Sequence, residues 1–296
     1  MELLKKKSLY ADLALILTQA IWGFGFIIVK ASLDIIHPVV LLGVEFTLSA
    51  AILGAYLFFK RKSLFQNYGK GLVLGFILWI GYMTHVIGLS TISATNAAFI
   101  TSLSIILVPL AGRFLFKKAI GIQNIVAVLI ALIGVWILTG GISNFRIGDV
   151  LTLFTALFVA LHILFTDKFV NEKTDPLTLN FQQLAVVGFL SLVTMAIFRF
   201  PVNVWHTSVI WTIIYVVLLA DIFAYVAQTF SQKYTLPVRV AIIFTLEPVF
   251  TAFFAWIFRT EALVFSTLVG GALVVLALLI SEIPFYKFFR FEKQRI

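Results

Sequence analysis

Apolar residues fill ten long runs along the chain, and each run is bounded by charged or turn-forming residues. The runs fall near 10–30, 39–59, 71–90, 96–116, 120–140, 148–169, 176–198, 208–230, 237–258 and 262–283. Each run is close to the roughly 20 residues that a helix needs to cross about 30 Å of hydrocarbon. The short alternating strands of a membrane barrel do not occur in the pattern. The pattern therefore predicts ten membrane-spanning helices.

Composition agrees with this interpretation. A chain of 296 residues that is 61% hydrophobic and 12% charged cannot hide its apolar surface in one water-soluble core. We therefore expect an all-α integral membrane protein. The absence of cysteine excludes disulfides and thiolate metal sites, and the sequence predicts no metal and no other cofactor. The net charge of +9 does not indicate nucleic-acid binding, because in such a chain the placement of the bases matters more than their sum.

The basic residues divide unequally between the two ends of the predicted helices. If the N-terminus lies inside, 18 of the 22 bases fall on the inner side. The outer side keeps Lys30, Arg146, Arg199 and Arg259. The positive-inside rule then places both termini in the cytoplasm, and we expect a multi-pass protein of the cell (inner) membrane.

The two halves of the chain resemble each other weakly. At an offset of 138 residues, Lys30 matches Lys168 and Pro38 matches Pro176, and at an offset of 143 Tyr82 matches Tyr225. Five helices per half make the second copy enter the bilayer from the opposite side, which is the inverted repeat of many secondary transporters. We expect a first repeat at 1–140, an inverted second repeat at 148–283 and a basic cytoplasmic tail at 284–296.

Three carboxyl groups fall at membrane depth, where an ionisable side chain is costly unless it faces water, a partner or the bundle interior. They are Glu45, Asp221 and Glu247. Each is a candidate for binding substrate or exchanging protons. Asp221 begins a polar helix face that continues with Tyr225 and Gln228. The alternative is a protonated carboxyl group that only bonds to a neighbouring helix.

Other polar residues extend this candidate cavity. Glu45 aligns with Gln183 of the second repeat, and the alternative role for Glu45 is a clamp to Lys30. His85 aligns with Gln228, and His162 lies halfway along its own predicted helix. Either histidine could titrate near neutral pH or could simply be a hydrogen-bonded packing residue.

Two prolines and several aromatic residues complete the set of candidates. Pro109 and Pro248 lie inside predicted helices, where a proline removes a backbone hydrogen bond. They predict kinks that serve either a gate or structure alone. Trp22, beside two glycines, and the matched pair Tyr82 and Tyr225 are candidate cavity residues.

Several motifs resemble those of the EamA family of the drug/metabolite transporter superfamily. The similar segments are Trp22-Gly23 with Phe26 and Lys30; Ala98-Phe99-Ile100-Thr101 and Val108-Pro109-Leu110; Ala224-Tyr225 and Gln228-Thr229; and Leu246-Glu247-Pro248-Val249-Phe250. The resemblance implies ten helices in two inverted repeats around a central cavity, and a family that commonly exports amino acids, other metabolites or toxic compounds.

Two positions depart from the family pattern. Lys117 and Lys118 stand where the first repeat often has glycine and glutamate, although Glu261 keeps the acid in the second copy. Glu45 stands where the family often has arginine. The charge that faces the cavity could therefore be reversed here, with a different substrate preference.

The expected function is a secondary exporter of small amphipathic solutes, which works by alternating access through a cavity walled by helices 1, 3, 4, 6, 8 and 9. Protons are a candidate coupling ion. The sequence contains no phosphate-binding loop, so direct use of ATP is not expected. The expected partners are a small-molecule substrate and membrane lipids, with the protein as a monomer or a homodimer.

Three other functions compete with solute export. A lipid flippase fits the 31 phenylalanines, because a cavity could open sideways to the bilayer. A channel would need a selective ring or a continuous pore. An enzyme is disfavoured, because the spacing from His162 to Asp167, although typical of an acyltransferase dyad, turns the two side chains about 140° apart on a helix.

Overall fold

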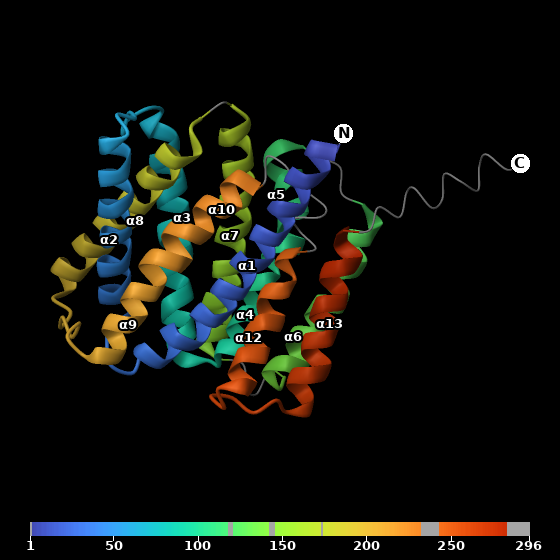
Figure 1. Cartoon of the computed structure of the whole chain (residues 1–296). Coiled ribbons are helices and arrows are strands. Elements are labelled where there is room, and N and C mark those ends of the chain that lie inside the picture. The colour runs from blue at the N-terminus through green and yellow to red at the C-terminus, as the bar shows by residue number, and fades with distance from the viewer. Residues whose placement is uncertain (1, 118–120, 142–145, 173, 232–242, 283–296) are drawn as a thin grey trace, which may run out of the picture.

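The computed structural model describes residues 2–117, 121–141, 146–172, 174–231 and 243–282, and all regular structure in these residues is helical (Figure 1). The first half holds α1 (Glu2–Ser32), α2 (Pro38–Phe59), α3 (Tyr68–Thr91), α4 (Ala94–Ser102), α5 (Ser104–Phe116) and α6 (Ile122–Thr139). The second half holds α7 (Ile147–Asn171), α8 (Pro176–Phe198), α9 (Thr207–Tyr215), the π-helical η2 (Val216–Phe223), α10 (Ala224–Ser231), α12 (Leu246–Ile257) and α13 (Phe265–Glu282).

Eight stretches of these helices are long and apolar enough to cross a membrane. Two of them join shorter elements, since α4 and α5 together form one stretch and α9, η2 and α10 form another. The helices α12 and α13 are apolar but shorter than 18 residues over their apolar part. The ninth predicted span begins at residue 237, and its start lies outside the described residues. The whole predicted tail, 284–296, also lies outside them.

The connections between helices alternate between the two ends of the bundle (Figure 1). The start of α1, the end of α13, and the α2–α3 and α7–α8 connections lie toward one end. The α1–α2, α3–α4, α8–α9 and α12–α13 connections lie at the other. This alternation puts the bases Lys60, Arg61 and Lys62 and the bases Arg199 and Arg259 in connections at opposite ends, as the unequal charge distribution requires. Which end faces the cytoplasm remains a prediction.

The packing of the helices is nearly unchanged when the two halves are exchanged. The second helices of the halves, α2 and α8, pack on each other, as do the fifth helices, α6 and α13. The contact of α3 with α7 has its counterpart in the contact of α1 with α10. Even the helix ends repeat, because Arg61 after α2 and Arg199 after α8 both adopt a left-handed conformation, with φ of 53° in each. The weak sequence repeat thus has a structural equivalent.

Small residues let helices of the two halves approach closely. In the contact of α6 with α13, a Cβ atom on Gly270 would lie 2.7 Å from the carbonyl oxygen of Gly134. In the contact of α3 with α7, a Cβ atom on Gly148 would lie 2.8 Å from the carbonyl oxygen of Gly88. Close backbone contact supplies van der Waals packing where lipid removes the hydrophobic drive for helix association. These glycines therefore fix how near the two halves stand.

Glu261, in the α12–α13 connection, caps a helix of the other half. Its carboxylate accepts hydrogen bonds from the backbone amides of Ala94 and Thr95, at the first turn of α4. A carboxylate at a helix N-terminus satisfies free amides and complements the helix dipole. Lys118, which stands at the position equivalent to Glu261 in the first repeat, lies outside the described residues.

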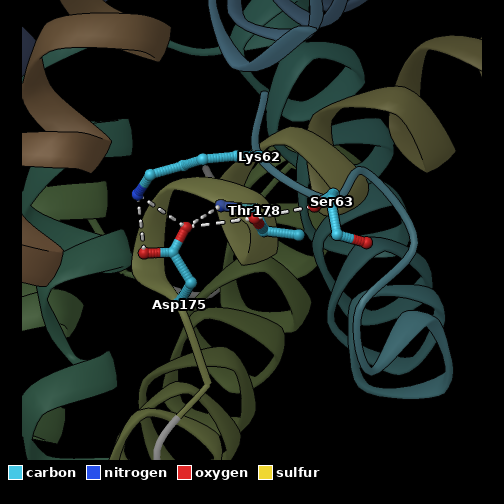
Figure 2. A network of polar contacts seen from close by, with 4 residues as sticks. All are labelled: Lys62, Ser63, Asp175 and Thr178. Atoms are coloured by element: carbon cyan, nitrogen blue, oxygen red, sulfur yellow. Dashed lines mark hydrogen bonds and ion pairs between the residues drawn. The ribbon is translucent and has the colours of Figure 1, made fainter. Parts of the chain in front are cut away.

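A polar network joins the α2–α3 connection to the start of α8 (Figure 2). Lys62 Nζ lies 3.1 Å from Asp175 Oδ1, and Thr178 donates to the carbonyl oxygen of Ser63 at 3.1 Å. Nearby, Lys70 pairs with Glu172 at 2.7 Å. Asp175 also caps α8, because its side chain accepts from the Thr178 amide. The network links the two halves at the end of the bundle where both connections lie.

This network makes the stability of the protein depend on pH through Asp175. Partial burial raises the pKa of the Asp175 carboxyl group, but the hydrogen bonds from Lys62 and Thr178 outweigh it, so the pKa lies below its usual value. A carboxyl group whose pKa is depressed on folding stabilises the protein above its ordinary pKa of about 3.9, and this contribution is lost as the pH falls through the depressed value.

We predict that Asp175→Asn lowers the melting temperature at pH 7, because the neutral amide still caps α8 but loses the attraction to Lys62. The difference from the wild type should begin to shrink below about pH 4 and disappear as the pH falls through the depressed pKa, where the wild-type carboxyl group protonates. Thermal unfolding in detergent from pH 7 to pH 3 measures this. An equal difference at both ends of the pH range would show that the charge of Asp175 does not stabilise the fold.

Candidate functional site

A central cavity lies where helices of both halves meet. Its volume, measured as the space open to the centre of a water molecule, is about 160 Å³. Its walls come from α1, α3, the α4–α5 junction, α7, η2 with α10, and the residues just before and at the start of α12, and from α2 through Glu45. The cavity walls therefore come from predicted helices 1, 3, 4, 6, 8 and 9, and predicted helix 2 adds one residue, Glu45.

The cavity collects nearly all the polar residues that the sequence predicts to act together. Lining it are Trp22, Glu45, Tyr82, His85, His162, Asp221, Tyr225, Gln228 and Glu247. Gln183 stands behind the wall and bonds to His162. The three carboxyl groups at membrane depth, which are far apart in the sequence, thus share one cavity.

Ser49 links two of the carboxyl-bearing segments. Its hydroxyl lies 2.8 Å from Asp221 Oδ2 and 2.8 Å from the backbone carbonyl oxygen of Glu45, one turn earlier on α2. Asp221 and Glu45 are 2% and 4% exposed, so both belong to the interior. Asp221 has this hydroxyl partner, whereas Glu45 Oε2 has no hydrogen-bond partner. The two residues therefore belong to the same cavity wall, but the hydrogen bonding of their carboxyl groups differs.

The wide turn of η2 carries Asp221. The amide of Ala224 bonds to the carbonyl oxygen of Leu219, five residues earlier instead of four. In the same turn, the carbonyl oxygen of Ala220 accepts a 3.0 Å hydrogen bond from the indole of Trp22 in α1. π-Helical turns leave backbone groups open to such outside partners and occur often at functional sites. Here the turn joins the first helix of one half to the carboxyl-bearing helix of the other.

The matched tyrosines of the two halves meet across the cavity. The hydroxyl oxygens of Tyr82 and Tyr225 lie 2.9 Å apart. Trp22 stands edge-on to Tyr225 with ring centroids 5.4 Å apart, and Phe46 stands edge-on to Tyr82 at 4.7 Å. The identical pair at the offset of 143 residues thus marks a direct contact between the halves.

A chain of hydrogen bonds runs outward from His162. Its Nε2 atom lies 2.7 Å from Gln183 Oε1, and Gln183 Nε2 donates to Asn180 at 2.6 Å. Asn180 Nδ2 donates to Thr229, whose hydroxyl bonds to the backbone of Tyr225. The chain connects α7, α8 and α10. His162 is therefore held in place by a chain of polar side chains, and both of its predicted roles stay predictions.

His85 has a different environment. It lines the cavity, and its ring stands edge-on to Phe26 with centroids 4.8 Å apart. Its Nδ1 atom has no hydrogen-bond partner among the described residues. Protein atoms cover this nitrogen, so a bond to water or a solute would require the ring to turn.

The two prolines lie close to breaks in the helices. The backbone leaves regular α-helix at Leu103, between α4 and α5, and at Thr245, just before α12. Pro109 lies six residues after the first break, inside α5, and Pro248 lies in the first turn of α12. Leu103 and Thr245 both keep right-handed helical φ and ψ, so the helix predicted at 96–116 remains one span, Ala94–Leu115, with a one-residue interruption. Thr101, Ser102 and Ser104, on either side of Leu103, line the cavity.

Two alternative roles from the sequence do not occur. The Lys30 ammonium donates to the carbonyl oxygens of Leu89 and Ser90 at 2.8 and 3.0 Å, so Lys30 caps the end of α3 and does not clamp Glu45. His162 is buried toward the cavity and bonds to Gln183, whereas Asp167 is exposed. The acyltransferase-like dyad is not formed.

Sequence reasoning missed three contributors to the site. Ser49 and Asn180 hold cavity groups in place, and η2 replaces a regular turn around Asp221. Ser49 could have been found, because it lies four residues after Glu45 on the same helix face. Nothing in the local sequence indicates the extra residue in the η2 turn.

A bundle of apolar helices around a polar central cavity is typical of membrane transporters, and comparison with known proteins supports that class. Residues 9–140 and 146–282 match the EamA-like transporter family. The chain belongs to this family and is a multi-pass membrane transporter.

Relatives cover almost the whole chain. A protein of Archaeoglobus fulgidus described as an uncharacterized transporter is 33% identical over 277 residues, covering 93% of this chain and 86% of its own. The uncharacterized transporter YoaV of Bacillus subtilis is 20% identical, covering 92% and 97%. A solved crystal structure with 16% identity has a TM-score of 0.70 and covers 92% of this chain and 96% of its own, which shows the fold alone.

We predict that the Tyr82–Tyr225 hydrogen bond stabilises the contact between the halves by about 0.6 kcal/mol, a typical value for a bond between membrane helices. A double-mutant cycle with Tyr82→Phe and Tyr225→Phe, measured by reversible unfolding in detergent, gives this coupling energy. Tyr56→Phe serves as a control, because Tyr56 is 47% exposed on α2 and its effect should add to that of Tyr225→Phe. Full additivity of Tyr82→Phe and Tyr225→Phe would contradict the predicted bond.

Proposed function

We propose that the protein is a secondary active transporter that exports small amphipathic organic solutes from the cell by alternating access through the central cavity. The observation that carries the proposal is the position of Glu45, Asp221 and Glu247, which share one cavity at the contact between the two halves. Ionisable groups at membrane depth mark substrate and ion pathways when they face such a space. The repeated helix packing supports movement of one half against the other.

Proton exchange is the proposed driving force. Asp221 is bound by the hydroxyl of Ser49, and the neighbouring Glu45 has an oxygen atom without a partner. A carboxyl group that faces a cavity can release its proton to one side and regain it from the other as the cavity reorients. Asp221 and Glu45 are the proposed carriers, and Glu247 is the third candidate.

The helix breaks at Leu103 and Thr245 support gating by the segments that carry Pro109 and Pro248. Each break lies beside the cavity and belongs to the corresponding helix of its half. Discontinuous helices at the middle of the membrane allow short segments to tilt separately. The proposed movement is a tilt of α5 and α12 relative to the segments before them.

The decisive experiment measures solute movement in proteoliposomes with an imposed pH gradient, across a panel of amino acids, amines and hydrophobic drugs. We predict that at least one solute moves against its gradient when a proton gradient is present, and that Asp221→Asn reduces the rate at least about tenfold, as expected for loss of a charged interaction of about 1.5 kcal/mol. Glu172→Gln is the matched control, because this carboxyl group lies at the Lys70 ion pair and not in the cavity.

Different results would contradict different parts of the proposal. A rate unaffected by the pH gradient would remove proton coupling but leave transport. Movement of fluorescent phospholipid between leaflets, with no movement of any solute, would identify a lipid flippase instead. Single-channel currents would identify a channel.

A further inference from the structure

The charge of the cavity wall is one-sided. Three carboxyl groups line it, and none of its described lining residues is lysine or arginine. Lys30 follows the lining residue Val29 on α1. Its ammonium group does not supply a positive charge to the wall, because it donates to the carbonyl oxygens of Leu89 and Ser90. A bound solute therefore meets carboxyl groups, hydroxyl groups and imidazoles, with no fixed positive charge from these residues.

Glu45 is an unsatisfied acceptor within this wall. Its side chain is 4% exposed, and its Oε2 atom has no hydrogen-bond partner. A buried polar atom without a partner costs about 1–3 kcal/mol, and a charged group costs more. The Ser49 hydroxyl bonds both to the backbone carbonyl oxygen of Glu45 and to Asp221, and the side chains of Glu45 and Asp221 line the same cavity. Because Glu45 lines the cavity, a rotation of its carboxyl group would bring the unpartnered Oε2 to a donor bound there.

Aromatic rings form much of the remaining wall. Trp22 and Tyr225 stand 5.4 Å apart at their centroids, and the rings of Phe26, Tyr82 and Phe244 also line the cavity. The faces of such rings attract cations, most strongly when the site excludes water. The same rings offer apolar surface to the body of a solute.

We propose that the cavity selects organic cations, meaning an ammonium group carried on an aromatic or alkyl body. The ammonium group binds between Glu45 and Asp221, and the body packs against Trp22, Tyr82 and Tyr225. An anion or a zwitterion would bring a carboxylate into a wall that already holds three carboxyl groups, with no lysine or arginine among the described lining residues to pair it. The inference rests on the proposed function, because it assigns a substrate class to the same cavity.

The test uses four compounds with the same phenylalkyl body and different charge. They are 2-phenylethylammonium, 2-phenylethanol, 3-phenylpropanoate and zwitterionic phenylalanine. Binding to the purified full-length protein in detergent is measured at pH 7.5 by isothermal titration calorimetry. The cation should bind at least tenfold more tightly than each of the other three.

The variants assign the binding to the carboxyl groups. Glu45→Gln keeps the shape of the side chain and removes its charge, and it should weaken binding of 2-phenylethylammonium at least tenfold while leaving the weak affinity for 2-phenylethanol unchanged. Asp221→Asn should do the same. Glu172→Gln, at the ion pair with Lys70, should bind like the wild type. Size-exclusion profiles and melting temperatures confirm that each variant is folded.

Each outcome decides the inference. Equal or tighter binding of the anion or the zwitterion, unchanged cation binding by folded Glu45→Gln, or no binding of the cation would overturn it. Transport of another solute in proteoliposomes would still support the proposed function in each of these cases. Conversely, a cation that binds in the cavity but is never moved across the membrane would contradict the transport function and leave the binding site standing.

Discussion

The cost of placing an ionisable side chain at membrane depth is the constraint on which the structure depends. Such a group must face water, a partner or the interior of the bundle. Glu45, Asp221 and Glu247 come from three different helices, yet all three face one cavity. The helices around them must therefore stand apart at this point and pack closely elsewhere. Gly134, Gly148 and Gly270 provide the close packing away from the cavity.

The junction of the two halves has two kinds of contact. Away from the cavity the contacts are tight, as in α6 with α13, where backbones approach through glycine. At the cavity the contacts include single hydrogen bonds, such as Tyr82 with Tyr225, Ser49 with Asp221 and Trp22 with the Ala220 carbonyl, although Gly23 also brings α1 close to the Glu247 carbonyl oxygen. Single bonds are far easier to exchange than interlocked backbones. The proposed rearrangement of the cavity would therefore exchange these single hydrogen bonds.

The described residues contain eight of the ten predicted spans, because about 20 apolar residues bounded by charges have few other stable forms in a membrane, and the count of ten stays a prediction. The sequence also identified the polar residues of the cavity, since polar side chains at membrane depth are rare enough to stand out. It did not predict the η2 turn around Asp221 or the break at Leu103, because both depend on contacts with helices far away in the sequence. The role of Lys30 was likewise invisible, since the carbonyl groups that it binds are exposed only at the end of α3.

The central claim is that the cavity opens in turn to each side of the membrane, and the absence of cysteine from the chain allows a direct test. A single cysteine replaces Val159, which lines the cavity, and a membrane-impermeant thiol reagent is applied to oriented vesicles from one side or the other. Cysteines at Phe65 and Val202, in connections at opposite ends of the bundle, report each side alone. The account predicts that Val159→Cys reacts from both sides, at rates that a transported solute changes in opposite directions. Reaction from one side only, with and without solute, would contradict it.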